Sequence, residues 1–442
     1  MQGLRLFYGG FMTKKEFRKA LLRGQGRCVL AVRSAPEKYR SEVLWACGHK
    51  IAYDAQCEGT RAWYIYEIVR CYEDRTEFVA AASDALIQTP SDRDWKIFYF
   101  AELLGHFAAD GDVRAAETLT QKYDALYEML MAQDRPEGIC SEAFDFEALC
   151  MVRATDIRSF LRIAGDVGRL LRTRCGYEED FSALRGEEKA SWRRALARRA
   201  ETDPDLAAYQ RSAGIEWTDT QPEKAENDER PPMPAQDRLS SIWLKKYGTP
   251  EEKAHYARIY REAQTLEERR KALLKFLKCP YPDNPVPIIA DADAADPALR
   301  ECAWQALGQI CHPDVRAFAL ERLSRTPEYA IQPLLANYRP EDDALLTELV
   351  QRTPVDRREV HPWHGIQFDL LTADYKHLKL PQTVLRHIYE TTYCSNCRNR
   401  AVRRLGRQRQ LSDEMLQECL WDSLDDTRQY AAQLLRRRGK KR

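Results

Sequence analysis

The chain has 442 residues, of which 44% are hydrophobic and 31% are charged, with 69 Lys and Arg against 68 Asp and Glu. A formal net charge of +1 excludes a globally basic nucleic-acid binder. No segment approaches the roughly 20 apolar residues of a membrane-spanning helix, so no membrane partner is expected.

The cysteine content and the start of the chain indicate a cytoplasmic protein. Thirteen cysteines, an odd number scattered through helical patterns, fit reduced thiols better than a disulfide framework. The first twelve residues lack the apolar stretch and the small-residue cleavage site of a secretory signal.

In chain order, the sequence predicts one helix after another. Thr13 and Glu16 have the spacing of a capping box, which opens an amphipathic run to Leu22. Further helical periodicity is found over residues 36–47, 60–72, 75–87, 91–108, 112–132, 141–172 and 187–199. Because the connections between these runs are short, neighbouring helices are expected to be antiparallel.

One stretch, around residues 218–237, is polar, rich in proline and nearly free of large apolar side chains. Such a composition is typical of a linker or a long surface loop. The sequence therefore predicts an N-terminal helical domain over residues 1–215, a linker over 216–238, and a C-terminal helical domain over 239–442.

A short motif occurs four times in the C-terminal half: Arg, two residues, Ala, three residues, Leu. The copies are Arg300-Ala303-Leu307, Arg316-Ala319-Leu323, Arg398-Ala401-Leu405 and Arg428-Ala431-Leu435. In a helix, the Ala and the Leu of each copy share one face, which offers a small contact point and a large core residue to neighbouring helices. This pattern predicts stacked helix pairs.

The motif resembles the second helix of a HEAT repeat, in which an Asp at the hairpin turn precedes an Arg that bonds along the stack. Asp residues stand before three of the copies: Asp296 before Arg300, Asp314 before Arg316, and Asp425 and Asp426 before Arg428. The match is best from Asp296 to Gly308, where Pro297 suits a helix start and Gly308 a helix stop. The resemblance covers residues 290–325 and 396–437.

This resemblance implies an all-α fold, a HEAT-like superhelix (solenoid) of stacked antiparallel helix pairs. The function expected of it is a non-enzymatic cytoplasmic interaction scaffold, whose concave surface binds a protein or peptide partner. The alternative is a nucleic-acid-binding HEAT-like protein, and the third possibility is an enzyme resembling the HEAT-like DNA glycosylases. HEAT repeats serve many functions, so the resemblance limits shape far more than activity.

Two pairs of potential metal ligands lie about 30 residues apart: His361 with His364, and Cys394 with Cys397. Two imidazoles and two thiolates suit tetrahedral zinc. The alternative is structural, with the cysteines packed at a helix start and the histidines in a Pro-containing loop. No cofactor is expected on balance, and zinc is the metal that these residues would hold.

Basic side chains outnumber acidic ones about two to one from Arg398 to the end of the chain. The candidate phosphate-binding residues are Arg398, Arg403, Arg404, Arg407 and Arg409. On a helical solenoid, such a cluster could meet a nucleic-acid backbone through counterion release. The alternative is a solvated last helix with a basic tail, favoured by the helix dipole.

Aromatic residues are concentrated in the N-terminal half, and Trp63 and Tyr66 fall on one helical face. Such a face can bind bases or a partner peptide, but more often it belongs to the core. Nearby, Glu58 and Arg61 could line a ligand pocket, or they could form a local ion pair.

Sequence motifs of several enzyme classes are absent from the sequence. It contains no phosphate-binding P-loop, no dinucleotide-binding glycine motif, no nucleophile elbow and no His-Glu-x-x-His. The eight histidines are dispersed and suggest no catalytic triad. An enzyme is therefore the less favoured interpretation.

Overall fold

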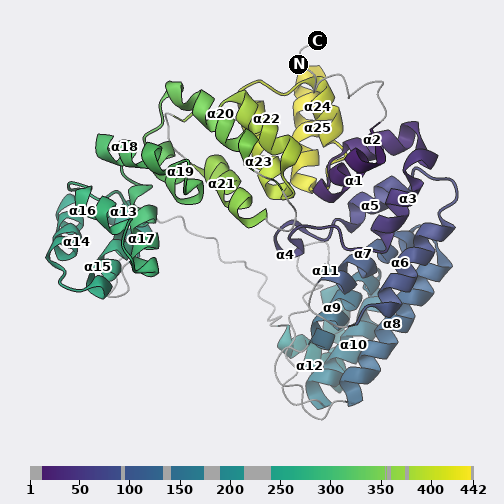
Figure 1. Ribbon diagram of the computed structural model, residues 1–442. Helices are drawn as coiled ribbons and strands as arrows, with labels where there is room; N and C mark the ends of the chain where they lie inside the picture. The colour runs from purple at the N-terminus through teal and green to yellow at the C-terminus, as the bar shows by residue number, and fades with distance from the viewer. Residues whose placement is uncertain are drawn as a thin grey trace. The chain divides into compact units, whose positions relative to one another are not determined.

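The computed structural model describes residues 12–90, 95–132, 141–173, 190–213, 240–353, 355, 360–373 and 378–439. Within these residues every regular element is a helix, so the predicted all-α class is confirmed (Figure 1). None of the described helices has the length and hydropathy that a membrane crossing requires.

The chain divides into two compact units, neither of which is continuous in sequence. Unit 1 consists of Met1–Pro222, Tyr393–Asn396 and Leu411–Arg442, and unit 2 consists of Glu223–Thr392 and Cys397–Gln410. The end of the chain thus groups with its beginning. The predicted linker, residues 216–238, lies outside the described residues, so the predicted domain boundaries at its two ends stay predictions.

Unit 1 contains fourteen of the helices of the described chain. They are α1 (Lys14–Arg23), α2 (Arg27–Ser34), α3 (Pro36–Cys47), α4 (Ala55–Glu58), α5 (Ala62–Val69), α6 (Thr76–Gln88), α7 (Lys96–Ala109), α8 (Val113–Ala132), α9 (Ser141–Arg153), α10 (Ile157–Thr173), α11 (Ala190–Ala200), α12 (Pro204–Ser212), α24 (Asp413–Cys419) and α25 (Asp425–Gly439). Most of them pack on their neighbours in sequence, such as α6 on α7, α7 on α8 and α24 on α25.

Unit 2 contains the helices between these, including α23 from Cys397 onward. They are α13 (Ser241–Tyr247), α14 (Pro250–Glu262), α15 (Leu266–Leu273), the 3-10 helix η2 (Leu274–Phe276), α16 (Val286–Asp291), α17 (Pro297–Leu307), α18 (Pro313–Arg322), α19 (Pro327–Ala336), the 3-10 helix η3 (Pro340–Asp342), α20 (Asp343–Arg352), α21 (Val360–Thr372), α22 (Gln382–Thr391) and α23 (Ser395–Arg407). Here too, helices near in sequence pack together, as in α14 with α15, α16 with α17 and α18 with α19.

Local capping signals set several helix ends where the sequence predicts them. The Thr13 hydroxyl accepts from the Glu16 N–H, and the Glu16 carboxylate accepts from the Thr13 N–H at 2.8 Å, which completes the capping box of α1. Asp296 accepts from the Leu299 N–H at 2.7 Å and caps α17, which ends at Gly308 as expected.

The single helical run predicted over residues 141–172 is wrong, because two helices occupy it. α9 ends at Arg153 and α10 begins at Ile157. Asp156 accepts hydrogen bonds from the backbone N–H groups of Arg158 and Ser159, at 2.7 and 3.0 Å. This cap satisfies two donors at a new helix start, which the apolar periodicity alone does not reveal.

Buried tyrosines contribute much of the core of unit 1. Tyr64 and Tyr99 are 0% exposed, and their hydroxyls donate to the carbonyls of Gln25 and Ala46, both at 2.7 Å. Each ring fills space between helices, and its buried hydroxyl finds a hydrogen-bond acceptor in a backbone carbonyl.

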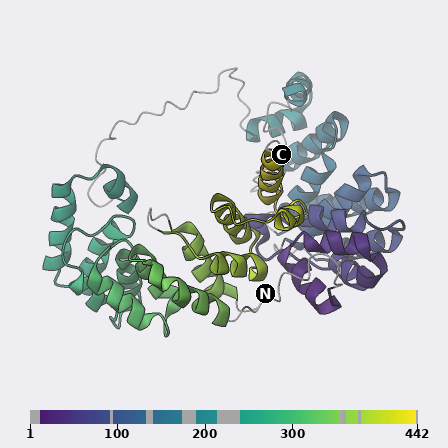
Figure 2. The ribbon, with the colours of Figure 1, turned by 90° about the horizontal axis from the view of Figure 1, so that it is seen from above.

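The C-terminal helix pair α24–α25 packs on the turn between α1 and α2, and Figures 1 and 2 both show these helices beside one another. The Ser423 N–H donates to the Gly24 carbonyl at 3.0 Å, and Arg27 donates to Glu418 at 2.7 Å. A Cβ on Gly26 would lie 1.9 Å from the Glu418 carbonyl oxygen. The turn therefore needs glycine at this position, since only a bare backbone lets the two segments approach so closely.

Candidate functional site

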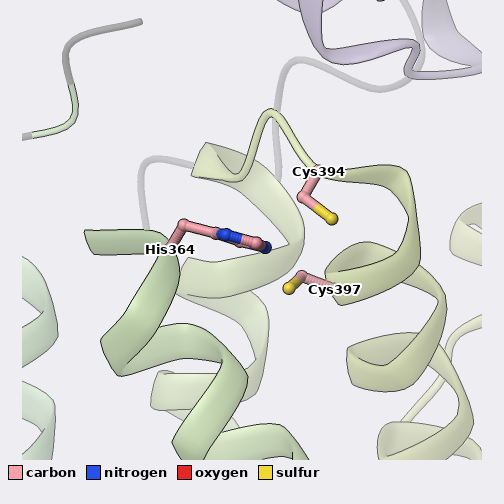
Figure 3. Close-up of side chains that lie close together, drawn as sticks. All are labelled: His364, Cys394 and Cys397. Carbon is pink, nitrogen blue, oxygen red and sulfur yellow. The ribbon is translucent and has the colours of Figure 1, made fainter. Parts of the chain in front are cut away.

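Three potential metal ligands lie together in the structure: His364, Cys394 and Cys397 (Figure 3). One ring nitrogen of the histidine and the two sulfur atoms are all within 4.8 Å of one another. His364 is on α21, Cys394 directly precedes α23, and Cys397 is in the first turn of that helix. These residues carry the donor types that zinc prefers in proteins.

The local sequence explains how the two thiols come to face the same space. Cys394 stands just before the helix and Cys397 three residues later, so one helical turn brings both sulfurs to the same end of α23. Both are nearly enclosed, with Cys394 6% exposed and Cys397 1% exposed. Neither is in a disulfide.

α21 presents His364 from the opposite side of the cluster, and its neighbour Trp363 anchors the helix. The Trp363 ring is 1% exposed and meets the ring of His387 edge-on at 5.8 Å between centroids. His364 itself is half-buried. The side chain of His361, the fourth predicted ligand, lies outside the described part of the structure.

A second polar cluster, the Glu58–Arg61 pair with its partners, lies inside unit 1. The two side chains are 0% exposed and are joined by an ion pair of 2.7 Å. Glu58 accepts from the backbone N–H groups of Tyr53 and Ser395, at 2.9 and 2.6 Å, and from the Ser395 hydroxyl. The carboxylate therefore joins the turn before α4 to the first residue of α23.

Arg61 makes the matching bonds with its guanidinium. It donates to the carbonyls of Leu22 at 2.7 Å and Tyr393 at 2.5 Å. Its own backbone has φ 67°, a left-handed conformation that is uncommon for a residue other than glycine. The tertiary bonds of the side chain hold the residue in that conformation.

The environment of Glu58 keeps it ionised. Burial by itself would raise the pKa of this carboxyl, but the Arg61 guanidinium and the hydrogen bonds from Ser395 outweigh it, and the pKa lies below its ordinary value. The pair thus has the character of a structural ion pair, which binds backbone groups of unit 1. The ligand-binding role expected for Glu58 and Arg61 stays a prediction.

Trp63 and Tyr66 both contact other side chains of unit 1. The Arg428 guanidinium lies 3.6 Å above the half-buried Trp63 ring. Tyr66 is 8% exposed and stacks on His106 at 4.9 Å. These contacts agree with the core interpretation of the aromatic cluster, because both rings already contact partners of the same unit.

The five candidate phosphate-binding arginines lie in different environments. Arg398 is 0% exposed, so its guanidinium is not available to a phosphate in this structure. Arg403 donates to Asn399 at 3.1 Å and Arg404 to the Ala373 carbonyl at 2.6 Å. Arg407, the last residue of α23, and Arg409, two residues beyond it, are exposed.

The sequence did not indicate the residues that complete these clusters. Ser395 and Tyr393 meet Glu58 and Arg61 across more than 300 positions of the chain. The spacing of Gly24 and Gly26 is a local sign that another segment approaches the backbone there, although it does not identify Glu418 or Ser423.

The chain was compared with protein-family models, with curated proteins and with solved structures, and none of the three comparisons gives a match.

Proposed function

We propose that the protein is a non-enzymatic interaction scaffold built from HEAT-like helix pairs. The observation that carries this proposal is a repeated arginine contact at the turn between paired helices. Arg300 of α17 donates to the Ala294 carbonyl at 2.9 Å, and Arg428 of α25 donates to the Asp422 carbonyl, also at 2.9 Å.

The two contacts have the same register. In each case the acceptor lies six residues before the arginine, and a second, longer bond reaches the residue after it, Ala295 at 3.5 Å and Ser423 at 3.1 Å. Arg300 follows α16 and Arg428 follows α24, the helices on which α17 and α25 pack. An arginine that binds the carbonyls of an interhelical turn fixes the second helix of a pair, as the HEAT resemblance implies.

The other two motif copies differ from this geometry. Arg316 of α18 forms a two-pronged ion pair with Asp342, at 2.7 and 2.8 Å, and also donates to the Asn337 carbonyl. Arg398 is buried. The repeat is therefore degenerate, and the proposal rests on the α16–α17 and α24–α25 pairs, each taken within its own unit.

Exposed apolar side chains on unit 2 support a binding role. Among the described residues, the largest such exposures in this unit are Ile242 at 65%, Leu266 at 55% and Val286 at 49%. Each lies in the first turn of its helix, α13, α15 or α16. Helix starts that project apolar groups into solvent offer contact points to another macromolecule.

Site-specific photo-crosslinking in the cells that make the protein tests this proposal. A photoreactive residue at Ile242, Leu266 or Val286 is expected to capture one recurring protein. The matched control is a photoreactive residue at Lys271 of α15, whose side chain is 68% exposed. Capture of the same mixture from the apolar positions and from the control would contradict the proposal.

A further inference from the structure

We propose that His364, Cys394 and Cys397 bind one zinc ion. The inference concerns a site that the scaffold function does not need, so either can fail alone. It rests on the donor set, on the distances between the donor atoms and on the local structure around the two thiols.

The distances are close to those of a zinc site. A Zn–S bond of about 2.3 Å and a Zn–N bond of about 2.0 Å place the ligand atoms of a tetrahedral site about 3.6–3.8 Å apart. The three donor atoms here are within 4.8 Å of one another. A contraction of at most about 1.2 Å in each distance, the difference between 4.8 and 3.6 Å, would bring them into bonding positions around one ion.

The chemistry of the three donor atoms favours zinc over calcium and magnesium. Two sulfurs and an imidazole suit zinc and other soft or borderline ions, whereas calcium and magnesium require oxygen ligands. Three protein ligands leave one position of the tetrahedron for a further ligand. We therefore expect a zinc site with two sulfur ligands and at least one nitrogen ligand.

The position of the cysteines places both sulfurs at one helix end. Cys394 and Cys397 lie at the N-terminal end of α23, a helix of 13 residues. Their burial limits the access of water to the sulfurs. A zinc ion bound here would therefore be enclosed by protein on the side of the two sulfurs.

Zinc bound here would join α21 to the start of α23. His364 is in the first half of α21, and the two cysteines bracket the first turn of α23. Since a metal that binds the folded chain stabilises it, the zinc affinity would appear as added stability of these helices.

The first test is the metal content of the full-length protein, purified without chelator or polyhistidine tag from zinc-supplemented cells. Inductively coupled plasma mass spectrometry should find about one zinc ion per chain. The variants His364→Ala, Cys394→Ser and Cys397→Ser should each bind zinc at least about tenfold more weakly. The matched control Cys311→Ser, at an exposed cysteine of unit 2, should keep the wild-type content.

A second measurement uses wild-type protein alone, so that it tests the site even if the variants fail to fold. Wild-type protein is stripped with a strong chelator, its helicity is checked by circular dichroism, and it is titrated with Co²⁺. Tetrahedral cobalt with thiolate ligands should give visible d–d bands and a near-ultraviolet charge-transfer band, and Zn²⁺ should abolish both. Zinc well below one per chain without a cobalt spectrum, or a Cys394–Cys397 disulfide in freshly purified protein, would overturn the proposal.

Discussion

The buried Glu58–Arg61 pair shows at the scale of single residues how a polar cluster can belong to the fold. Its guanidinium and carboxylate are 0% exposed, and they bind the backbone of two segments far apart in the chain. A buried charge is tolerated only when a partner and hydrogen bonds replace the lost water, and both are present here.

Removing one member of this pair should destabilise unit 1. Glu58→Gln leaves the Arg61 guanidinium buried without its carboxylate, and we expect a loss of about 3–5 kcal/mol in the free energy of unfolding. Urea unfolding followed by circular dichroism measures it. The control is Arg270→Gln, which breaks the Glu267–Arg270 pair of the same spacing, whose side chains are 54% and 32% exposed, and should cost at most about 1 kcal/mol. Equal costs for the two variants would refute the structural role.

The stabilisation from Glu58 should also depend on pH. Because its pKa is lowered in the folded chain, the contribution is fully present above the unfolded value, near 4.5, and is lost as the pH falls through the folded value. The gap in unfolding free energy between wild type and Glu58→Gln should therefore be constant from pH 7 to 5 and should narrow below pH 4.5. Urea titrations at each pH give this gap, and a gap that stays constant to pH 3 would contradict the assignment.

At the scale of elements, the close approach of α24 to the α1–α2 turn depends on Gly26. The Gly26→Ala variant keeps an ordinary backbone conformation, with φ −60°, but its Cβ would lie 1.9 Å from a carbonyl oxygen. We expect a loss of about 1–3 kcal/mol and faster proteolysis of the C-terminal helices. In the control Gly48→Ala, the nearest atom to the new Cβ is 3.8 Å away, and little change is expected. Equal behaviour of the two variants would show that α24 does not pack there.

Helix ends were the part of the fold that the sequence predicted best, because the signals for them are local. The Thr13–Glu16 box and the Asp296 cap act within one turn, and both form as predicted. The break at Asp156 was missed because the apolar periodicity continues on both sides of it. The pairing of Leu411–Arg442 with unit 1 depends on contacts across the whole chain, which no local pattern encodes.

The sequence predicts part of the candidate metal site as well. The pairing of His361 with His364 and of Cys394 with Cys397, three positions apart in each case, predicts metal ligands, and the structure brings His364, Cys394 and Cys397 together. The cysteine pair could be foreseen because one helical turn places both sulfurs together. The approach of α21 could not, since it follows from tertiary packing around side chains such as Trp363.

For the whole molecule, near-neutral charge and the environment of the arginines bear on the nucleic-acid alternative. Arg398 is buried, and Arg403 and Arg404 donate to groups of their own unit. We expect DNA and RNA binding no tighter than the roughly 10⁻⁶–10⁻⁴ M typical of non-specific contacts. Fluorescence anisotropy with a salt titration tests this. Tight binding that falls steeply with salt and is lost in Arg403→Ala/Arg407→Ala/Arg409→Ala would establish the alternative.

A binding scaffold must bind its partner directly, so the decisive measurement is the affinity of the captured partner, purified and titrated against the full chain. Leu266→Asp should weaken binding at least about tenfold, a loss of about 1.4 kcal/mol. Asp suits the first turn of α15, so folding should be preserved. The control Lys271→Ala should bind like wild type. The scaffold function would be contradicted if the partner bound both variants as tightly as wild type. It would also be contradicted if no captured protein bound the purified chain.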